Sequence, residues 1–372
     1  MSTKIRNSRI ELLRIISMFL IVYDHIIIFT NWNLTNDYVR DTILEIPTIG
    51  GKLGVNIFFL ITGYFLIKKN NYRFNGTIKI ILTTLFYSWI GVLISYLFKL
   101  PGISWKLNFQ GIFPIEFGSY WFITVYVFLM LIYPYINKLV INLTQIQYFF
   151  LLILGFVCLF IWSCFFSNKV SGISEGSTLL TGVYVYLLGG YIRLYNKTKD
   201  LYKKNIINLT IFFLSLILMI VSIFLINILQ VHGFLRYGLH KYMKFIDGDS
   251  PLQLIASMAI FIYTIDKPSF ENKFINIIAS TSLAVYILDT NISFRHYMYD
   301  FVIQAQKLQF SNYIYLYCLI VSIFIFLIFI TIELIRQLVM RKTEDNLSIK
   351  ISNYLLRIIS KLYQFLIKKI NK

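Results

Sequence analysis

Ten apolar segments, each long enough to cross a bilayer as a helix, constrain this chain more than any other feature of its sequence. The hydrocarbon core is about 30 Å thick, and a helix needs roughly 17 to 25 apolar residues to cross it. Single apolar runs of this length satisfy their backbone hydrogen bonds inside lipid as helices. We therefore predict an all-α fold, a polytopic membrane helix bundle of about ten transmembrane helices. The predicted segments are 11–30, 54–67 with its flanks, 77–98, 120–140, 147–166, 178–195, 206–229, 252–267, 274–292 and 312–335.

The composition excludes a soluble domain. Hydrophobic residues make up 58% of the 372 residues, charged residues only 14%, and the mean hydropathy is +0.70. A soluble fold of this length needs a polar exterior that these proportions do not supply. The first apolar segment follows Lys4, Arg6 and Arg9, is long enough to span, and lacks a small-residue cleavage site. We interpret it as a membrane helix and not as a signal peptide.

The basic residues predict the orientation of the bundle. A net charge of +18 would suggest nucleic acid as the partner of a soluble chain, but in a membrane protein the side that carries the charges matters more. One side mixes basic with acidic residues, whereas the other collects the strongly basic stretches. We therefore expect both termini in the cytoplasm, membrane lipids as partners, no nucleic acid, and a bacterial plasma membrane as the location. The basic stretches are 4–9, 68–79, Lys138, 193–204, Lys267, Lys273 and the C-terminal tail.

The C-terminal tail has its own helical pattern. Its basic residues recur at spacings of seven and four, which draws one stripe on a helix whose other faces are apolar. Such a helix lies on a membrane surface against anionic head groups. We therefore divide the chain into a transmembrane domain, 1–340, and a basic amphipathic interfacial helix, 341–372. The stripe consists of Lys350, Arg357, Lys361, Lys368 and Lys372.

The first segment, Ser8 to Thr30, carries ionisable residues that a plain anchor lacks: Glu11, Arg14, Asp24 and His25. Arg14 and His25 are eleven residues apart, so they project from nearly the same helix face, roughly 16 Å apart along the axis. Ionisable groups at that depth are costly and indicate function. Two simpler roles stay open, because Arg14 can pair with Glu11 and His25 can form an ordinary helix–helix hydrogen bond. Asp24 points about 100° away from His25 and is not predicted as its partner.

Four stretches of the sequence carry a family resemblance: RIISMFLIVYDH (14–25), GVNIFFLITGYFL (54–66), SYWFITVYVFLMLIYP (119–134) and STSLAVYILDTNI (280–292). The first resembles the opening helix of the acyltransferase family 3 membrane proteins, and the second resembles that family's signature, Gly-Val-Asp/Asn-x-Phe-Phe-x-x-Ser-Gly-Phe/Tyr. The third is similar to the family's Trp-Phe segment, and the resemblance extends to the fourth. The family transfers acyl groups to extracytoplasmic carbohydrates and related acceptors. The resemblance implies a ten-span layout and the same activity.

The resemblance also implies a set of cavity residues, with two departures from the family pattern. Thr62 stands where the family usually has serine and keeps the hydroxyl. Asp289 stands where a Tyr-x-x-His pattern would supply histidine, which indicates either a different acceptor or a pair between Asp289 and a basic group in the cavity. The expected cavity residues are Asn56, Thr62, Tyr64, Trp121, Tyr286 and Asp289.

The chemistry of acyl transfer fits the first helix. A base must take the hydroxyl proton as the acceptor attacks a thioester, and a neutral imidazole does this near pH 7, so His25 is the predicted general base. Coenzyme A is polyanionic and cytoplasmic, which favours Arg14, Glu11 and Arg9 as the donor-binding residues. We expect acetyl-CoA as the donor and no metal.

The three cysteines show no metal or redox spacing, and no nucleophile motif occurs, which favours direct transfer over an acyl-enzyme.

The outer loops, 31–53 and 230–251, mix aromatic residues with acids and amides. Aromatic faces beside such groups suit a carbohydrate acceptor, although an ordinary interfacial aromatic belt has the same composition. His232 and His240 share a helical spacing, but a third metal ligand is missing. The expected acceptor-side residues are Trp32, Arg236, His240 and Arg295.

The sequence therefore predicts a membrane O-acyltransferase, most simply an O-acetyltransferase. It would move an acyl group from cytoplasmic acyl-CoA to a hydroxyl of an extracytoplasmic polysaccharide or other glycan. The alternative is a membrane exporter or flippase of a polysaccharide or lipid-linked precursor, since transporters also need many spans and a polar cavity. Transporters often contain paired halves with broken helices, and the sequence shows no such symmetry.

Overall fold

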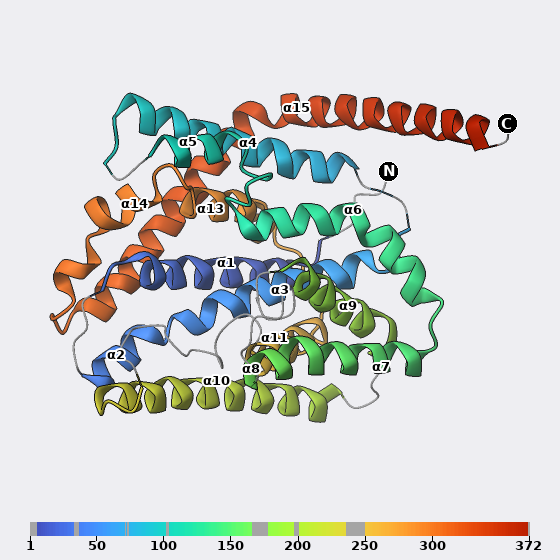
Figure 1. Cartoon of the computed structure of the whole chain (residues 1–372). Coiled ribbons are helices and arrows are strands. Elements are labelled where there is room, and N and C mark those ends of the chain that lie inside the picture. Colours follow the sequence, from blue (N-terminus) through green and yellow to red (C-terminus); the bar gives the residue numbers. More distant parts are fainter. Residues whose placement is uncertain are drawn as a thin grey trace.

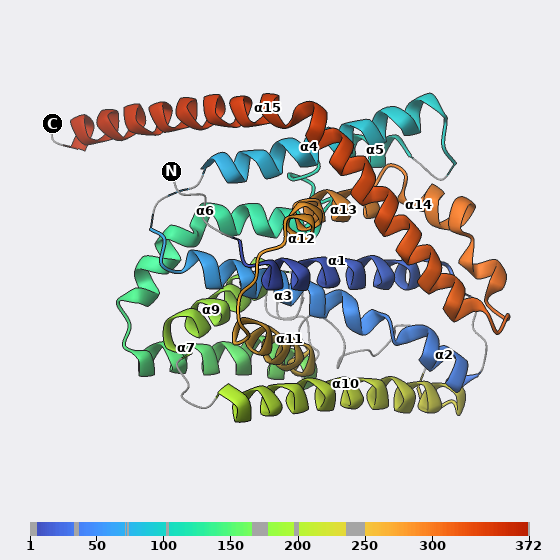
Figure 2. The ribbon, with the colours of Figure 1, turned by 180° about the vertical axis from the view of Figure 1, so that it is seen from behind.

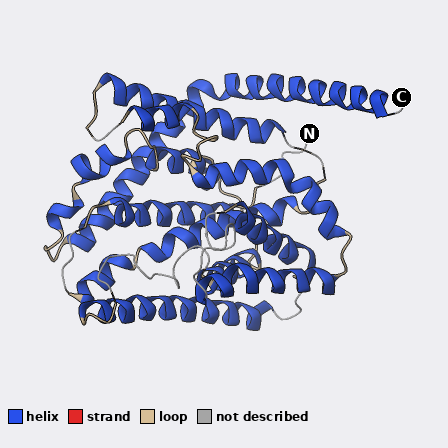
Figure 3. Cartoon of the chain, viewed as in Figure 1, coloured by secondary structure: helices blue, strands red, loops and turns tan. Residues whose placement is uncertain are grey.

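The computed structural model describes residues 6–32, 37–70, 72, 74–101, 104–165, 178–196, 201–235 and 250–370. Across these ranges the chain forms helices and contains no strand (Figure 3), which confirms the predicted all-α class. The helices are α1 (Ser8–Phe29), α2 (Tyr38–Glu45), α3 (Thr48–Leu66), α4 (Phe74–Leu97), α5 (Trp105–Ile112), α6 (Trp121–Ile141), α7 (Gln145–Phe156), η1 (Val157–Ile161), α8 (Trp162–Phe165), α9 (Leu179–Tyr195), α10 (Leu201–Val231), α11 (Pro251–Ile265), α12 (Lys273–Ala279), α13 (Ser282–Asp289), α14 (Arg295–Tyr297), η2 (Met298–Ile303), η3 (Ala305–Leu308) and α15 (Ile314–Ile370).

Seven helices of the described chain are long and apolar enough to cross a membrane. Three predicted segments are missing from this set because their helices are shorter: 178–195 forms α9, 252–267 forms α11, and 274–292 forms the broken pair α12 and α13. The polytopic bundle is therefore confirmed, whereas the count of ten and the cytoplasmic termini stay predictions. The seven are Ser8–Phe29, Tyr38–Leu66, Phe74–Leu97, Trp121–Ile141, Gln145–Phe165, Lys203–Val231 and Ile314–Gln364.

Part of the predicted outer loop 31–53 is helical, which corrects the sequence reading. The Asp37 side chain accepts hydrogen bonds from the first backbone amides of α2 and so caps that helix. Asn227 of α10 donates to Thr42 Oγ1 at 3.2 Å and to Glu45 Oε2 at 3.0 Å. These bonds hold α2 against α10, and the chain enters α3 three residues after α2 ends.

Helix α3 packs between α1 and α9, and glycines allow the close approach (Figure 1). A Cβ on Gly54 would lie 2.6 Å from the backbone oxygen of Ser17 on α1. A Cβ on Gly189 of α9 would lie 2.1 Å from the backbone oxygen of Leu60 on α3. The glycines on these faces bring the backbone of α1, which carries His25, directly against α3, which carries the family signature.

The start of α1 is tied to the start of α12. The Ser8 hydroxyl donates to Asn276 Oδ1 at 2.9 Å and accepts from the backbone amide of Asn272 at 2.7 Å. The Ser8 amide also donates to the carbonyl of Phe270 at 2.9 Å. Because α13 follows α12 after two residues, these bonds place α13 beside α1 (Figure 2).

Helix α15 includes the predicted tail. It is continuous from Ile314 to Ile370, changes direction along its length, and its last part reaches beyond the rest of the bundle (Figures 1 and 2). Its middle is held by a buried ion cluster, in which Arg336 bonds Glu333 Oε2 at 2.7 Å and Glu344 Oε2 at 3.1 Å. The tail is thus helical through Ile370, and its location at the membrane surface stays a prediction.

We predict that Gly189→Ala destabilises the bundle by about 1–3 kcal/mol, because the new methyl group overlaps the α3 backbone, which cannot turn away. Thermal unfolding of the purified protein in detergent measures this. Gly76→Ala is the matched control, since a Cβ there meets nothing within 4 Å and a helix tolerates alanine well. Equal stability of the two variants would show that the α3–α9 contact is looser than described.

Candidate active site

His25 of α1 faces Asp289, the last residue of α13. The His25 Nδ1 atom lies in very close contact with Asp289 Oδ2. His25 is 7% exposed and Asp289 is fully buried, so the pair is largely removed from solvent. The basic group that the sequence left unnamed as a partner for Asp289 is therefore His25 itself.

Tyr299 completes the surroundings of the carboxylate. Its hydroxyl donates to Asp289 Oδ1 at 2.8 Å, so each carboxylate oxygen has one partner. An ionised carboxylate only accepts hydrogen bonds, so the proton of a neutral His25 lies on Nδ1 in this pair. The other ring nitrogen, Nε2, is then left with a lone pair that can accept a proton.

Aromatic rings surround the histidine. The centroid of the Phe29 ring lies 4.8 Å from that of His25, and the Tyr286 ring lies 6.2 Å away. Tyr286 also contacts Phe122 of α6, with centroids 5.4 Å apart. The guanidinium of Arg295 lies 4.3 Å above the Phe29 ring. Of the predicted residues, Tyr286, Asp289 and Arg295 are thus gathered near His25.

The predicted donor-binding residues divide between two faces of α1. Arg14 Nη1 forms an ion pair with Glu11 Oε2 at 3.2 Å, and the Arg14 side chain is 30% exposed. Arg9 instead donates through Nε to the carbonyl of Pro268 at 3.0 Å, with its guanidinium 5.3 Å from the Phe270 ring. Arg9 and Arg14 are five residues apart, which places them about 140° apart around the helix.

The predicted residues of α3 have different surroundings. Asn56 is 5% exposed, and its Nδ2 has no hydrogen-bond partner among the described residues. The Thr62 hydroxyl donates to the carbonyl of Phe58 at 2.7 Å, as hydroxyls in helices commonly do. The Tyr64 hydroxyl accepts from Arg193 Nη1 at 2.9 Å. A buried amide without a partner is rare, which makes Asn56 the candidate on α3 most suited to bind a substrate oxygen.

Of the remaining predicted residues, the structure describes Trp121 and Trp32. Trp121 begins α6, and the ammonium of Lys52 lies 4.7 Å from its ring centroid. Trp32 Nε1 donates to the carbonyl of Ile27 at 2.7 Å, which closes the end of α1. Arg236 and His240 lie outside the described residues. In the described part of the chain no three His, Cys, Asp or Glu side chains gather as metal ligands do.

Hydrogen bonds to α15 and α4 hold helix α13 near both of its ends. Near its start, the Ser280 hydroxyl bonds Gln337 Oε1 at 3.3 Å. Beyond its end, Asn291 Nδ2 donates to the carbonyl of Tyr87 at 3.0 Å, and the Tyr87 hydroxyl donates to Glu333 Oε2 at 2.6 Å. These bonds fix the position of Asp289 against α4 and α15.

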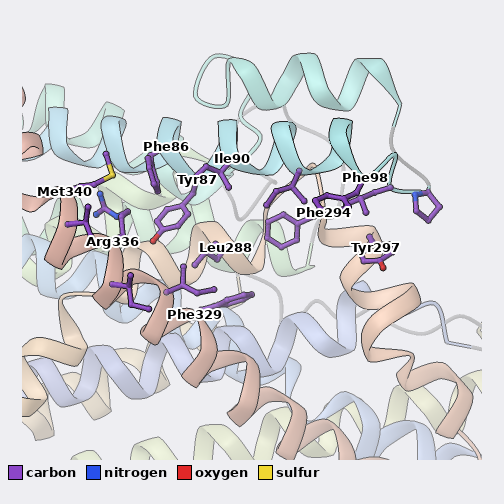
Figure 4. Close-up of a pocket in the computed structure, with 16 residues that line it drawn as sticks. Phe86, Tyr87, Ile90, Phe98, Leu288, Phe294, Tyr297, Phe329, Arg336 and Met340 are labelled. Carbon is purple, nitrogen blue, oxygen red and sulfur yellow. The ribbon is translucent and has the colours of Figure 1, made fainter.

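An apolar groove of about 1010 Å³ lies between α4 and α15, on the side of α13 that carries Leu288 (Figure 4). Figure 4 places Arg336 and Met340 at one end of the groove and Tyr297 toward the other. Leu288, which lines the groove, directly precedes Asp289 in α13.

Taken together, the fold and the buried histidine–aspartate pair define a multi-pass membrane protein with a general-base candidate inside its helix bundle. The chain matches the family model of acyltransferase family 3, described as an acyltransferase domain, over residues 7–333, and it belongs to that family. The predicted family is therefore confirmed. The comparison with curated proteins found no match, and neither did the comparison with solved structures. The family match ends at Glu333, inside α15.

The sequence reasoning missed Tyr299, Glu333 and Arg336. Tyr299 follows Asp289 by ten residues, and residues 290–294 between α13 and α14 are not helical, so no helical spacing relates the two. Glu333 and Arg336 are three residues apart at the end of the last apolar segment. Two opposite charges at this place in a membrane helix could have predicted a buried ion pair.

We predict that Tyr299→Phe lowers the free energy of unfolding by about 1–3 kcal/mol, because it leaves a buried Asp289 oxygen without a donor. Thermal unfolding in detergent measures the change. Tyr297→Phe is the control, since that ring stacks on Phe301 and its hydroxyl has no described hydrogen bond. Tyr299→Phe behaving like its control would argue against the described carboxylate contact.

Proposed function

We propose that this acyltransferase moves an acyl group, most simply acetyl, from cytoplasmic acyl-CoA to a hydroxyl of an extracytoplasmic polysaccharide or glycan, with His25 as the general base. The buried contact between His25 and Asp289 supports the proposal most strongly. In this arrangement the aspartate fixes the tautomer of the ring and stabilises the imidazolium that forms during catalysis. The enzyme would act in a bacterial cell membrane.

The proposed reaction is direct transfer. The acceptor hydroxyl gives its proton to His25 Nε2 while its oxygen bonds to the thioester carbonyl carbon. The carbon–sulfur bond then breaks, and the leaving thiolate takes the proton from the imidazolium, which releases free coenzyme A and restores neutral His25. Asp289 stays ionised throughout, held by Tyr299 on its other oxygen.

The donor would approach from the cytoplasmic end of α1. Arg14 is partly exposed there and keeps guanidinium donors beyond the one that bonds Glu11, so it suits a phosphate of coenzyme A. Glu11 orients that guanidinium. Arg9 faces another side of α1, where it bonds the Pro268 carbonyl, so Arg14 is the proposed contact for this phosphate.

The acceptor would approach from the outer end. Asn56 offers an unsatisfied amide donor, and Trp121 presents an aromatic face suited to a sugar ring. Thr62, Tyr64 and Tyr286 would shape the surroundings. Trp32, Arg236, His240 and Arg295 remain proposed for the outer approach.

We predict that His25→Ala abolishes the ester on the surface glycan while the protein still reaches the membrane in normal amounts. NMR of the isolated glycan from cells with either variant measures this. Unmodified polymer at the surface would support acyl transfer, because an exporter variant would stop the polymer from appearing. Unchanged acylation would exclude His25 as the base.

We predict that Asp289→Asn lowers kcat roughly 10²–10⁴-fold, since the amide neither favours the productive tautomer nor stabilises the imidazolium. Turnover of acetyl-CoA by the purified protein with acceptor glycan provides the assay. Asp24→Asn is the matched control, a buried carboxylate next to His25 in sequence but on another helix face, and it should lose far less activity. Equal losses in the two variants would contradict the assignment of Asp289.

A further inference from the structure

A second groove, about 320 Å³ in volume, lies between α1, α3, α10 and α11. It runs along α1 from Arg9 to Leu20, which is eleven residues or roughly 16 Å. Leu12 is 38% exposed and Ile16 is 47% exposed, so the groove opens on the lipid side of α1. This face is turned away from Arg14, so the groove is separate from the proposed donor site.

The groove is charged only at its cytoplasmic end. Arg9 and Lys267 line it there, whereas Leu20, Leu53 and Phe212 line it farther toward the middle of the bundle. Arg9 lies at the start of α1, and Lys267 lies just beyond the end of α11. The bond from Arg9 to the Pro268 carbonyl brings these two helix ends together. The lining therefore matches an amphiphile with a head at the cytoplasmic surface and a chain within the membrane.

The two cations are held in place without neutralisation by a carboxylate. The Lys267 ammonium lies 4.6 Å from the Tyr263 ring centroid, and Arg9 bonds the Pro268 carbonyl. Among the described residues neither Arg9 nor Lys267 forms an ion pair. Asp266, the carboxylate next to Lys267 in the sequence, pairs with Lys204. The positive charge at this end is thus available to an anion from the surrounding leaflet.

Ser17 provides an independent observation. It is fully buried, lines the groove, and its Oγ has no hydrogen-bond partner among the described residues. Helical serines normally bond the carbonyl four residues earlier, and a buried hydroxyl without a partner is unusual. A donor at this depth suits an oxygen of a bound amphiphile, such as an ester carbonyl.

We propose that this groove binds an anionic phospholipid of the cytoplasmic leaflet. The phosphate lies between Arg9 and Lys267, and one acyl chain lies along α1 toward Leu20. Ser17 donates to an oxygen of the lipid. The bound lipid fills the gap between α1 and α10 and so supports the helix that carries His25.

The test uses the full-length protein, stripped of lipid in detergent, with phosphatidylglycerol or phosphatidylcholine of identical chains added and binding read by native mass spectrometry. Wild type should prefer phosphatidylglycerol. The preference should fall roughly 20- to 30-fold in Arg9→Gln/Lys267→Gln, because each cation near a head group contributes about fivefold. Arg6→Gln/Lys273→Gln is the control, since it removes two exposed cations outside the groove and should keep the preference.

Two further measurements keep the result specific. Ile16→Trp fills the groove from its exposed side without entering the core, and it should weaken binding of both lipids. Equal binding of the two lipids by wild type, or an equal loss in the control pair, would overturn the proposal. Displacement of phosphatidylglycerol by palmitoyl-CoA in wild type but not in Arg9→Gln/Lys267→Gln would also overturn it, because the groove would then belong to an acyl donor.

Discussion

The contact between His25 and Asp289 is the interaction on which the arrangement of the bundle depends. A carboxylate buried among helices is costly unless it is paired and hydrogen-bonded, and Asp289 gains a partner on each oxygen. That contact requires α1 and α13 to lie side by side. Ser8 ties the start of α1 to α12, and Asn291 ties the end of α13 to α4. The rest of the structure thus positions one buried pair.

The same rule governs the second buried cluster. Arg336 lies between Glu333 and Glu344, and Tyr87 donates to Glu333, so each of these buried charged groups has a partner. A buried cluster of this kind is weak evidence for stability, because desolvation offsets much of the attraction between charges. The geometry of the cluster is more informative, because Tyr87 of α4 bonds both Glu333 of α15 and Asn291 at the end of α13. The family match ends at this cluster, while α15 continues through the basic tail.

Much of the fold and part of the site could be predicted from sequence. Apolar length predicted most of the long membrane helices, and the ionisable residues of the first segment directed attention to the helix that carries the buried His25–Asp289 contact. The pairing of His25 with Asp289 could not be derived, since 264 residues separate them and only the packed fold brings them together. Tyr299 was missed for the same reason. Helix α2 was missed because its polar residues Thr42 and Glu45 bond to Asn227, which is distant in sequence.

The most direct test is nitrogen NMR of the protein labelled with ¹⁵N-histidine, with the His25 signals identified by their loss in His25→Ala. The chain has four histidines, so the spectrum is simple enough for this assignment. We expect His25 to carry a proton on Nδ1, toward Asp289, with the lone pair on Nε2, and Asp289→Asn to change that tautomer. A proton on Nε2 that is insensitive to Asp289→Asn would contradict a general base oriented by this carboxylate.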